Sequence, residues 1–181
     1  LSGRGEMLSG NLRVSYLGTD GFNAAADPVR YKAVNGSFPN PDRDGYYQTS
    51  MSGSIAIRPA KGHELGITGY NVTGKNDYDG GGPTVFAYAN VATTVLSAYS
   101  RNQWTDDWTS TVRFGQAEDS STNFAPTRSL FETVQNQWMV ENQIGLPLGS
   151  VLIGYEYLSQ EVNSTTRYAV RERTVSSPFL G

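Results

Sequence analysis

Two short acidic segments are the parts of this sequence best suited to bind a metal ion. They are Asp42-Arg43-Asp44-Gly45 and Asp77-Tyr78-Asp79-Gly80. In each segment two carboxylates stand two residues apart on a predicted turn, so their oxygens can converge on a hard cation such as calcium. The competing interpretation is that aspartate and glycine are common turn formers on a solvated surface. Neither segment is an EF-hand loop, because the twelfth positions, Gly53 and Tyr88, lack the closing glutamate.

Residues that could support catalysis are scarce. His63 is the only histidine and falls in a predicted short turn, which argues against a catalytic triad and against a site with several histidines. Cysteine is absent, so thiolate sites and disulfides are excluded. The acidic residues at Asp106-Asp107, Glu118-Asp119 and Glu132 could supply the paired carboxylates of a glycosidase, but they fall at predicted turns and strand ends, where charge is expected. We therefore expect that the chain is not an enzyme.

Composition limits the remaining classes. The chain has 14 Lys+Arg against 17 Asp+Glu, so it has no basic surplus to neutralise nucleic-acid phosphates. Apolar residues make up only 38%, with 20 Gly and 11 Tyr. A barrel wall needs apolar residues on one side only, so this low fraction fits a barrel better than a soluble domain with a large core. No apolar run approaches the roughly 20 residues of a membrane helix.

The strongest pattern is an alternation of apolar and polar residues with a period of two, which is typical of strands with one apolar and one polar face. The pattern predicts seven strands and no helix. The apolar positions that define six of these strands are Leu12, Val14 and Tyr16; Met51, Ile55 and Ile57; Leu65 and Ile67; Trp108, Val112 and Phe114; Trp138 and Val140; and Val151, Ile153, Tyr155 and Tyr157. Residues 93–100 form a further strand whose faces the pattern does not assign, and another strand begins near Pro178-Phe179.

The predicted connections alternate in length. Long loops are expected at 19–46, 75–91, 118–129 and 163–175, and short ones at 59–63, 102–106 and 145–149. In an up-and-down sheet this alternation places all long loops at one end, as in transmembrane barrels. The predicted strands are also near the ~9–11 residues that a tilted membrane-spanning strand needs.

Charged residues at the polar positions agree with this interpretation. They are Arg13, Arg58, Arg113, Glu141 and Glu156, which suit a water-filled or plugged lumen better than a dry core. Tyr and Trp near the strand ends favour the membrane–water boundary. The sequence thus predicts an all-β fold, an antiparallel up-and-down transmembrane β-barrel, of which residues 1–181 supply a partial wall of about seven to eight strands.

Three segments resemble one family in particular. Thr19-Asp20-Gly21-Phe22-Asn23 ends a predicted strand, Pro41-Asp42-Arg43-Asp44-Gly45-Tyr46 opens the next, and Asn76-Asp77-Tyr78-Asp79-Gly80 follows one hairpin later. Together they resemble the early barrel of TonB-dependent outer-membrane receptors, most closely the cobalamin transporter branch. The likeness extends over the whole chain as a pattern of strands and loops, but its specific motifs are confined to residues 19–82. It implies a bacterial outer-membrane barrel of about 22 strands around a plug, with the plug and the remaining strands outside this chain.

The resemblance also implies a function. We expect active import of a scarce bulky nutrient, cobalamin, that binds to extracellular loops and plug and is driven by an inner-membrane TonB complex acting on the plug. In the cobalamin branch, loop aspartates hold calcium. By motif Asp42, Asp44 and Asp79 correspond to these ligands, and Asp77 is an adjacent candidate. Asn23 and Asn90 stand where an acidic ligand is common, and an asparagine carbonyl can still coordinate calcium, although the lower charge should weaken binding.

Two other interpretations stay open. A receptor for a ferric siderophore would share the barrel and the Thr-Asp-Gly-Phe strand end without needing calcium. A calcium-dependent, soluble carbohydrate-binding β-sandwich would bury the apolar strand faces against one another. The chain as a barrel fragment is expected to aggregate in water, whereas the sandwich would be soluble without detergent.

Overall fold

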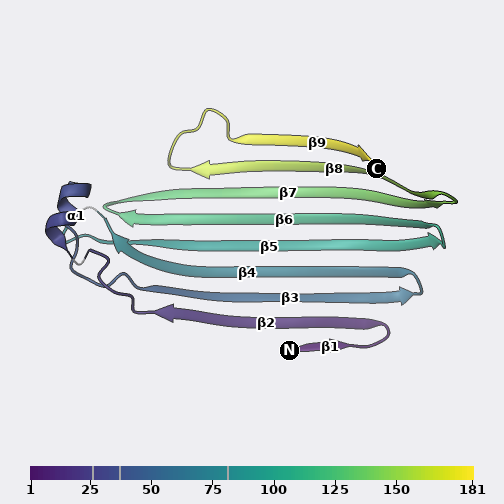
Figure 1. The fold of residues 1–181 in the computed structure, drawn as a ribbon, viewed down its shortest axis with the longest axis horizontal. Helices are drawn as coiled ribbons and strands as arrows, with labels where there is room; N and C mark the ends of the chain where they lie inside the picture. Colours follow the sequence, from purple (N-terminus) through teal and green to yellow (C-terminus); the bar gives the residue numbers. More distant parts are fainter. Residues whose placement is uncertain (26, 37, 81) are drawn as a thin grey trace.

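Nine strands lie side by side in chain order in one antiparallel sheet in the part of the chain that the structure describes (Figure 1). The structure is a computed structural model and describes residues 1–25, 27–36, 38–80 and 82–181. The strands are β1 (Ser2–Arg4), β2 (Leu8–Thr19), β3 (Tyr46–Ala60), β4 (His63–Asp79), β5 (Phe86–Thr105), β6 (Trp108–Ala125), β7 (Thr127–Leu146), β8 (Gly149–Ser164) and β9 (Glu172–Leu180). One helix, α1 (Pro28–Asn35), lies between β2 and β3. The all-β, up-and-down antiparallel prediction is therefore confirmed.

The strand register gives the sheet two different faces. Cross-strand partners share a face, because side chains alternate along each strand. One set of partners forms the apolar face: Gly10, Ile55, Ile67, Ala98, Phe114, Trp138 and Tyr157 in one row, and Leu12, Gly53, Gly69 and Leu96 in the next. The polar face has the rows Ser54, Thr68, Ser97, Gly115 and Gln137, and Ala56, Gly66, Tyr99, Arg113, Met139 and Glu156. The register also assigns faces to residues 93–100, where Leu96 and Ala98 lie on the apolar face.

The sheet is a single layer with almost no buried interior. Among the described residues, the buried hydrophobic side chains are only Ala25, Ala87 and Ala89. Large side chains of the apolar face are exposed, including Val14 (63%), Ile55 (62%) and Ile67 (57%). Each Å² of apolar surface left in water forgoes about 25 cal/mol of burial free energy. The sheet is therefore held together by hydrogen bonds between paired strands and not by a core. Burial of its apolar face requires apolar groups that do not belong to the sheet.

Several strands are longer than the alternation predicted. Residues 75–79 and 86–91 were expected within a loop, but they pair as Lys75↔Asn90 through Asp79↔Phe86. Residues 118–125 and 127–129 also continue β6 and β7, and only Pro126 separates Ala125 from Thr127. Similarly, β8 continues to Ser164. The predicted long loops at 75–91, 118–129 and 163–175 were thus wrong in extent. Residues 118–123 and 127–129 are polar on both faces, and residues 86–91 are mostly apolar on both faces, so neither kind of extension shows the two-residue hydrophobic alternation.

The prediction of no helix was also wrong, because α1 lies within the expected loop 19–46. Asp27 caps the helix by accepting hydrogen bonds from the backbone N–H groups of Val29 and Arg30. Proline follows in the first turn, and Gly36 ends the helix in the left-handed conformation. The sequence missed β1 as well, a strand of 3 residues that pairs with the start of β2.

The connections fall at two ends of the sheet (Figure 1). The α1 end carries residues 20–45, 80–85, 126 and 165–171, and the tight-turn end carries residues 5–7, 61–62, 106–107 and 147–148. Three of the four connections at the α1 end are the longer ones, so the predicted asymmetry holds except at Pro126. Within the described ranges, no helix combines the length and the apolar character that crossing a membrane requires.

Candidate metal centre

Three carboxylates gather at the α1 end of the sheet. Asp42 and Asp44 belong to the segment before β3, and Asp79 is the last residue of β4. One carboxylate oxygen from each lies within 4.8 Å of the other two, and all three residues are half-buried. This spacing allows the three oxygens to bind one cation, and these three residues are the ones that the resemblance matched by motif.

Backbone contacts around Asp44 fix one side of the cluster. The Asp44 N–H donates to the Phe22 carbonyl oxygen at 3.1 Å, and the Asp44 carboxylate accepts from the Ala24 N–H at 3.1 Å. Gly21 has a left-handed φ of 67°, and a Cβ atom there would overlap the carbonyl oxygen of Asp44. The start and the end of the 20–45 connection are therefore joined at Asp44, and glycine is required for that close approach.

The same connection is attached to the β4–β5 hairpin. The Asp77 N–H donates to the Gly45 carbonyl oxygen at 2.9 Å, which extends the pairing of β3 with β4 by one step. Asn40 is only 5% exposed, and its side-chain amide donates to the Val85 carbonyl oxygen at 3.4 Å. These contacts place Asp42 and Asp44 beside the end of β4.

Asp79 is electrostatically unfavourable in this position without a cation. Burial raises the pKa of its carboxyl group, the nearby Asp44 carboxylate raises it further, and Asp42 adds a smaller effect. The backbone N–H of Asn40 lowers the pKa, yet both Asp79 oxygens are inaccessible to solvent and neither has a hydrogen-bond partner among the described residues. Buried polar atoms are nearly always paired. A bound hard cation would satisfy both oxygens, so the residues present fit calcium.

The other predicted ligands lie outside this group. Asp77 forms an ion pair with Lys75, with 2.6 Å between Oδ1 and Nζ, and this hydrogen bond is the main reason that the pKa of Lys75 is raised. The Asn23 side-chain oxygen accepts from the Ala25 N–H at 2.9 Å within its own turn. Asn90 lies in β5 opposite Lys75. The sequence did not identify Gly21 and Asn40 as residues that build the site. The only signal for Gly21 was its position directly before the aromatic Phe22.

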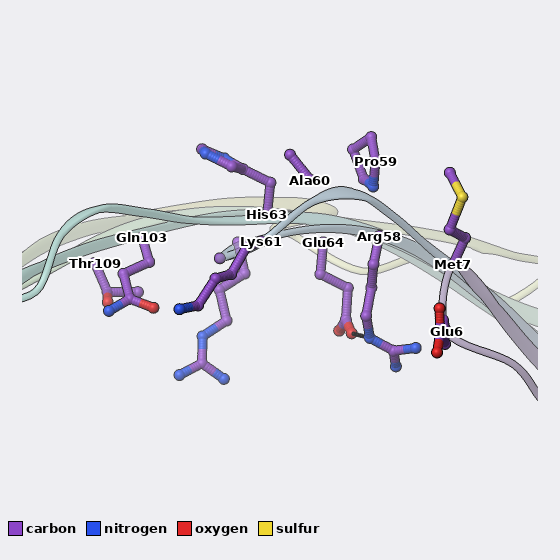
Figure 2. Close-up of a pocket in the computed structure, with 12 residues that line it drawn as sticks. Glu6, Met7, Arg58, Pro59, Ala60, Lys61, His63, Glu64, Gln103 and Thr109 are labelled. Atoms are coloured by element: carbon purple, nitrogen blue, oxygen red, sulfur yellow. Dashed lines mark ion pairs between the residues drawn. The ribbon is translucent and has the colours of Figure 1, made fainter.

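The tight-turn end has a groove of about 670 Å³ with a different character (Figure 2). On its polar side Arg58 forms an ion pair with Glu64 at 2.8 Å, and Lys61 points the same way, while His63 and Pro59 project from the other side of the strands. The Tyr99 hydroxyl donates to Glu64 at 2.7 Å. The charges of Arg58 and Glu64 are mutually satisfied, so this side of the groove presents a paired polar surface.

On the apolar side of the same end, aromatic rings cluster. The ring of His63 lies edge-on to Trp104 at 5.6 Å, and Trp104 lies 6.1 Å from Trp108. The indole N–H groups donate to Ser110 at 2.7 Å and to Asn142 at 3.1 Å. This aromatic cluster combines apolar rings with satisfied polar tips.

The comparisons with known proteins do not add to this geometry. No protein-family model matches the chain, and no curated protein matches it. The features of the molecule that bear on function are therefore the two faces of the sheet and the acidic cluster at its α1 end.

Proposed function

We propose that residues 1–181 form part of the wall of a transmembrane β-barrel in a bacterial outer membrane. The observation that carries this proposal is the single-layer sheet with one apolar and one polar face. In a barrel wall the apolar face contacts lipid and the polar face lines the interior, so both faces are satisfied without a second layer. The charged residues at Arg113, Glu141 and Glu156 then face the lumen.

The aromatic cluster supports this placement. Trp104 and Trp108 lie at the tight-turn end of the apolar face, where a membrane–water boundary would cross the sheet. Tryptophan prefers this boundary because its ring is apolar and its N–H is polar. Toward the α1 end the same face becomes polar: the row that contains Leu96 continues as Gln116, Asn136 and Ser159 in β6 to β8, and the next row holds Asn71, Thr94 and Glu118. The apolar band is therefore bounded on both sides.

The proposed activity is TonB-dependent import of a scarce bulky nutrient, cobalamin. Strands of 15 to 20 residues exceed the ~9–11 needed to cross the membrane, so they would extend beyond it and carry the α1-end connections outward. These connections and the adjoining end of β4 hold the acidic cluster and several exposed apolar side chains, a surface that suits ligand capture. The chain would act as a transporter and not as an enzyme, with a TonB complex acting through a plug.

Calcium would serve as a structural ion in this receptor. Asp42, Asp44 and Asp79 would hold it, and Asn23 and Asp77 could contribute further oxygens if their present contacts were exchanged. When bound, calcium would neutralise the repulsion among the three carboxylates. It would thereby connect the 20–45 segment to β4 and order the ligand-binding surface.

Two alternatives differ in what they require. A ferric-siderophore receptor would use the same wall but would bind its ligand without calcium. A soluble carbohydrate-binding sandwich needs a second sheet against the apolar face, and all nine strands of the described ranges belong to one sheet. The acidic cluster, with its unpartnered Asp79 oxygens, favours the calcium-dependent cobalamin receptor.

Titration calorimetry on the full-length protein in detergent tests the proposal. We expect calcium binding that Asp42→Asn/Asp44→Asn abolishes, together with an affinity for cobalamin that falls when calcium is chelated. The matched control is Asp106→Asn/Asp107→Asn, which removes the same charge at the tight-turn end and should leave both affinities unchanged. Calcium-independent binding of a ferric chelate in place of cobalamin would support the siderophore receptor instead.

A further inference from the structure

Phe22 is an aromatic side chain displayed next to the acidic cluster. It is 75% exposed, and no stacking or cation–π contact of its ring is found within the described residues. An exposed apolar side chain alone needs no explanation. What distinguishes Phe22 is the way its backbone is held.

Gly21, Phe22 and Ala24 all contact Asp44. The Phe22 carbonyl oxygen itself accepts from the Asp44 N–H, the Ala24 N–H donates to the Asp44 carboxylate, and Gly21 lies directly against the Asp44 carbonyl. On the other side, the Gly21 N–H donates to the Thr19 hydroxyl at 3.1 Å. A backbone held at Gly21, at the Phe22 carbonyl and at Ala24 restricts the directions in which the Phe22 side chain can lie.

We infer that Phe22 is a ligand-contacting side chain that the acidic cluster positions. The inference rests on the proposed function and names a residue for it. An exposed phenyl ring provides an apolar surface of low conformational entropy, suited to a bulky ligand with apolar groups, such as the methyl-bearing edge of a corrin ring. Because Asp44 belongs to both the cluster and the Phe22 contacts, cation binding at the cluster reduces the freedom of Phe22 before the ligand arrives.

This arrangement predicts a coupling between calcium and the contribution of Phe22. A side chain that calcium positions strengthens ligand binding only when calcium is present. Linkage then requires that cobalamin raises the affinity for calcium by the same factor. Replacing Phe22 should lower that factor while leaving calcium binding without cobalamin unchanged, since the side chain offers no ligand atom.

The test measures the binding of cyanocobalamin to the full-length protein in detergent, with calcium and with a chelator. Phe22→Ala should weaken cobalamin binding about tenfold with calcium and have no effect with the chelator. Phe22→Trp should retain most of the affinity. Val170→Ala is the matched control, because Val170 is also 75% exposed at the α1 end and has no contact with Asp44 among those described. Calcium titrations without cobalamin should be identical for all four proteins.

Three results would overturn the inference. If the Phe22→Ala variant binds cobalamin as tightly as the unmodified protein in the presence of calcium, then Phe22 does not contact the ligand. Equal losses with and without calcium show a contact that the cluster does not position. If the unmodified protein fails to bind cobalamin under either condition, the proposed substrate is wrong and this inference falls with it, an outcome visible before any variant is made.

Discussion

Gly21 and Asp44 approach so closely that a Cβ atom on Gly21 would overlap the Asp44 carbonyl oxygen. These residues are the two ends of a connection that contains a helix, and their contact brings the Thr19-Asp20-Gly21-Phe22 strand end against the first acidic segment. The geometry of the acidic cluster therefore depends on Gly21, which has no side chain that could bind the cation.

The first prediction follows from this contact. Gly21→Ala should weaken calcium binding at least tenfold, because alanine in a left-handed conformation costs about 1–2 kcal/mol and its methyl group must also displace Asp44. Gly36→Ala is the matched control, since Gly36 has a φ of 78° but open space around its Cβ position. Calorimetry compares the two variants. Equal calcium affinities would show that the Gly21–Asp44 contact does not shape the site.

A second prediction concerns Asp79 and pH. Burial and Asp44 raise its pKa, so the folded, calcium-free protein retains this proton at a pH where an unfolded chain has lost it. Stability of the calcium-free segment therefore increases as pH falls through the raised pKa toward the pKa of the unfolded chain, and it is lost as pH rises through the raised pKa. Calcium affinity should show the opposite trend and weaken as pH falls, because the proton competes with the cation.

Asp79→Asn separates these two effects. The variant should resist proteolysis of residues 20–45 better than the unmodified protein when calcium is chelated at neutral pH, because one repulsive charge is gone. It should also lose the protection that calcium confers. Limited proteolysis between pH 5 and 8, with calcium or a chelator, measures both. A calcium response that persists in Asp79→Asn would remove Asp79 from the site.

The sequence predicted the part of the fold where the two faces differ. Alternation identified the strands around Ile55, Ile67 and Phe114 because only there does one face consist of apolar residues. Beyond that band, segments such as 118–123 are polar on both faces, and their pairing depends on backbone hydrogen bonds to β5 and β7, which the side-chain pattern does not show. Helix α1 was missed although Asp27 and Gly36 are ordinary capping residues, since its few turns carry no apolar stripe.

The candidate site was predictable to a similar extent. The spacing in the acidic segments indicated Asp42, Asp44, Asp77 and Asp79, and only the resemblance ranked Asp77 behind the other three. The register of β3 against β4 brings these three residues together. The same register leaves Asp77 outside the group, where it pairs with Lys75. Asn40 gave no local signal, because its partner Val85 lies in a connection 45 residues further along.

A third prediction tests packing on the polar face. The Tyr99 ring covers Gly66, where a Cβ atom would overlap the ring, and its hydroxyl donates to Glu64. Gly66→Val should displace the ring and lower the free energy of unfolding by about 1–3 kcal/mol. Gly69→Val, three residues along the same strand, meets open space on the apolar face and should be tolerated. Urea unfolding in detergent compares them, and equal losses would mean that the Tyr99–Gly66 contact is not stabilising.

The last prediction concerns which face meets lipid. Ile67 and Thr68 are neighbours in β4 that point to opposite faces, with Ile55 and Ala98 beside Ile67 and with Ser54 and Ser97 beside Thr68. Lysine on the lipid side of a barrel costs about 2–4 kcal/mol near the bilayer midplane, whereas lysine in the lumen stays hydrated. Ile67→Lys should therefore reduce stability in lipid vesicles by that amount, and Thr68→Lys should not. In a soluble sandwich the two lysine variants would also differ in stability, because Ile67 would face the core. The unmodified protein would then, however, unfold reversibly in water without vesicles. Equal tolerance of both lysines in vesicles would contradict the barrel wall, because neither face would then lie in hydrocarbon.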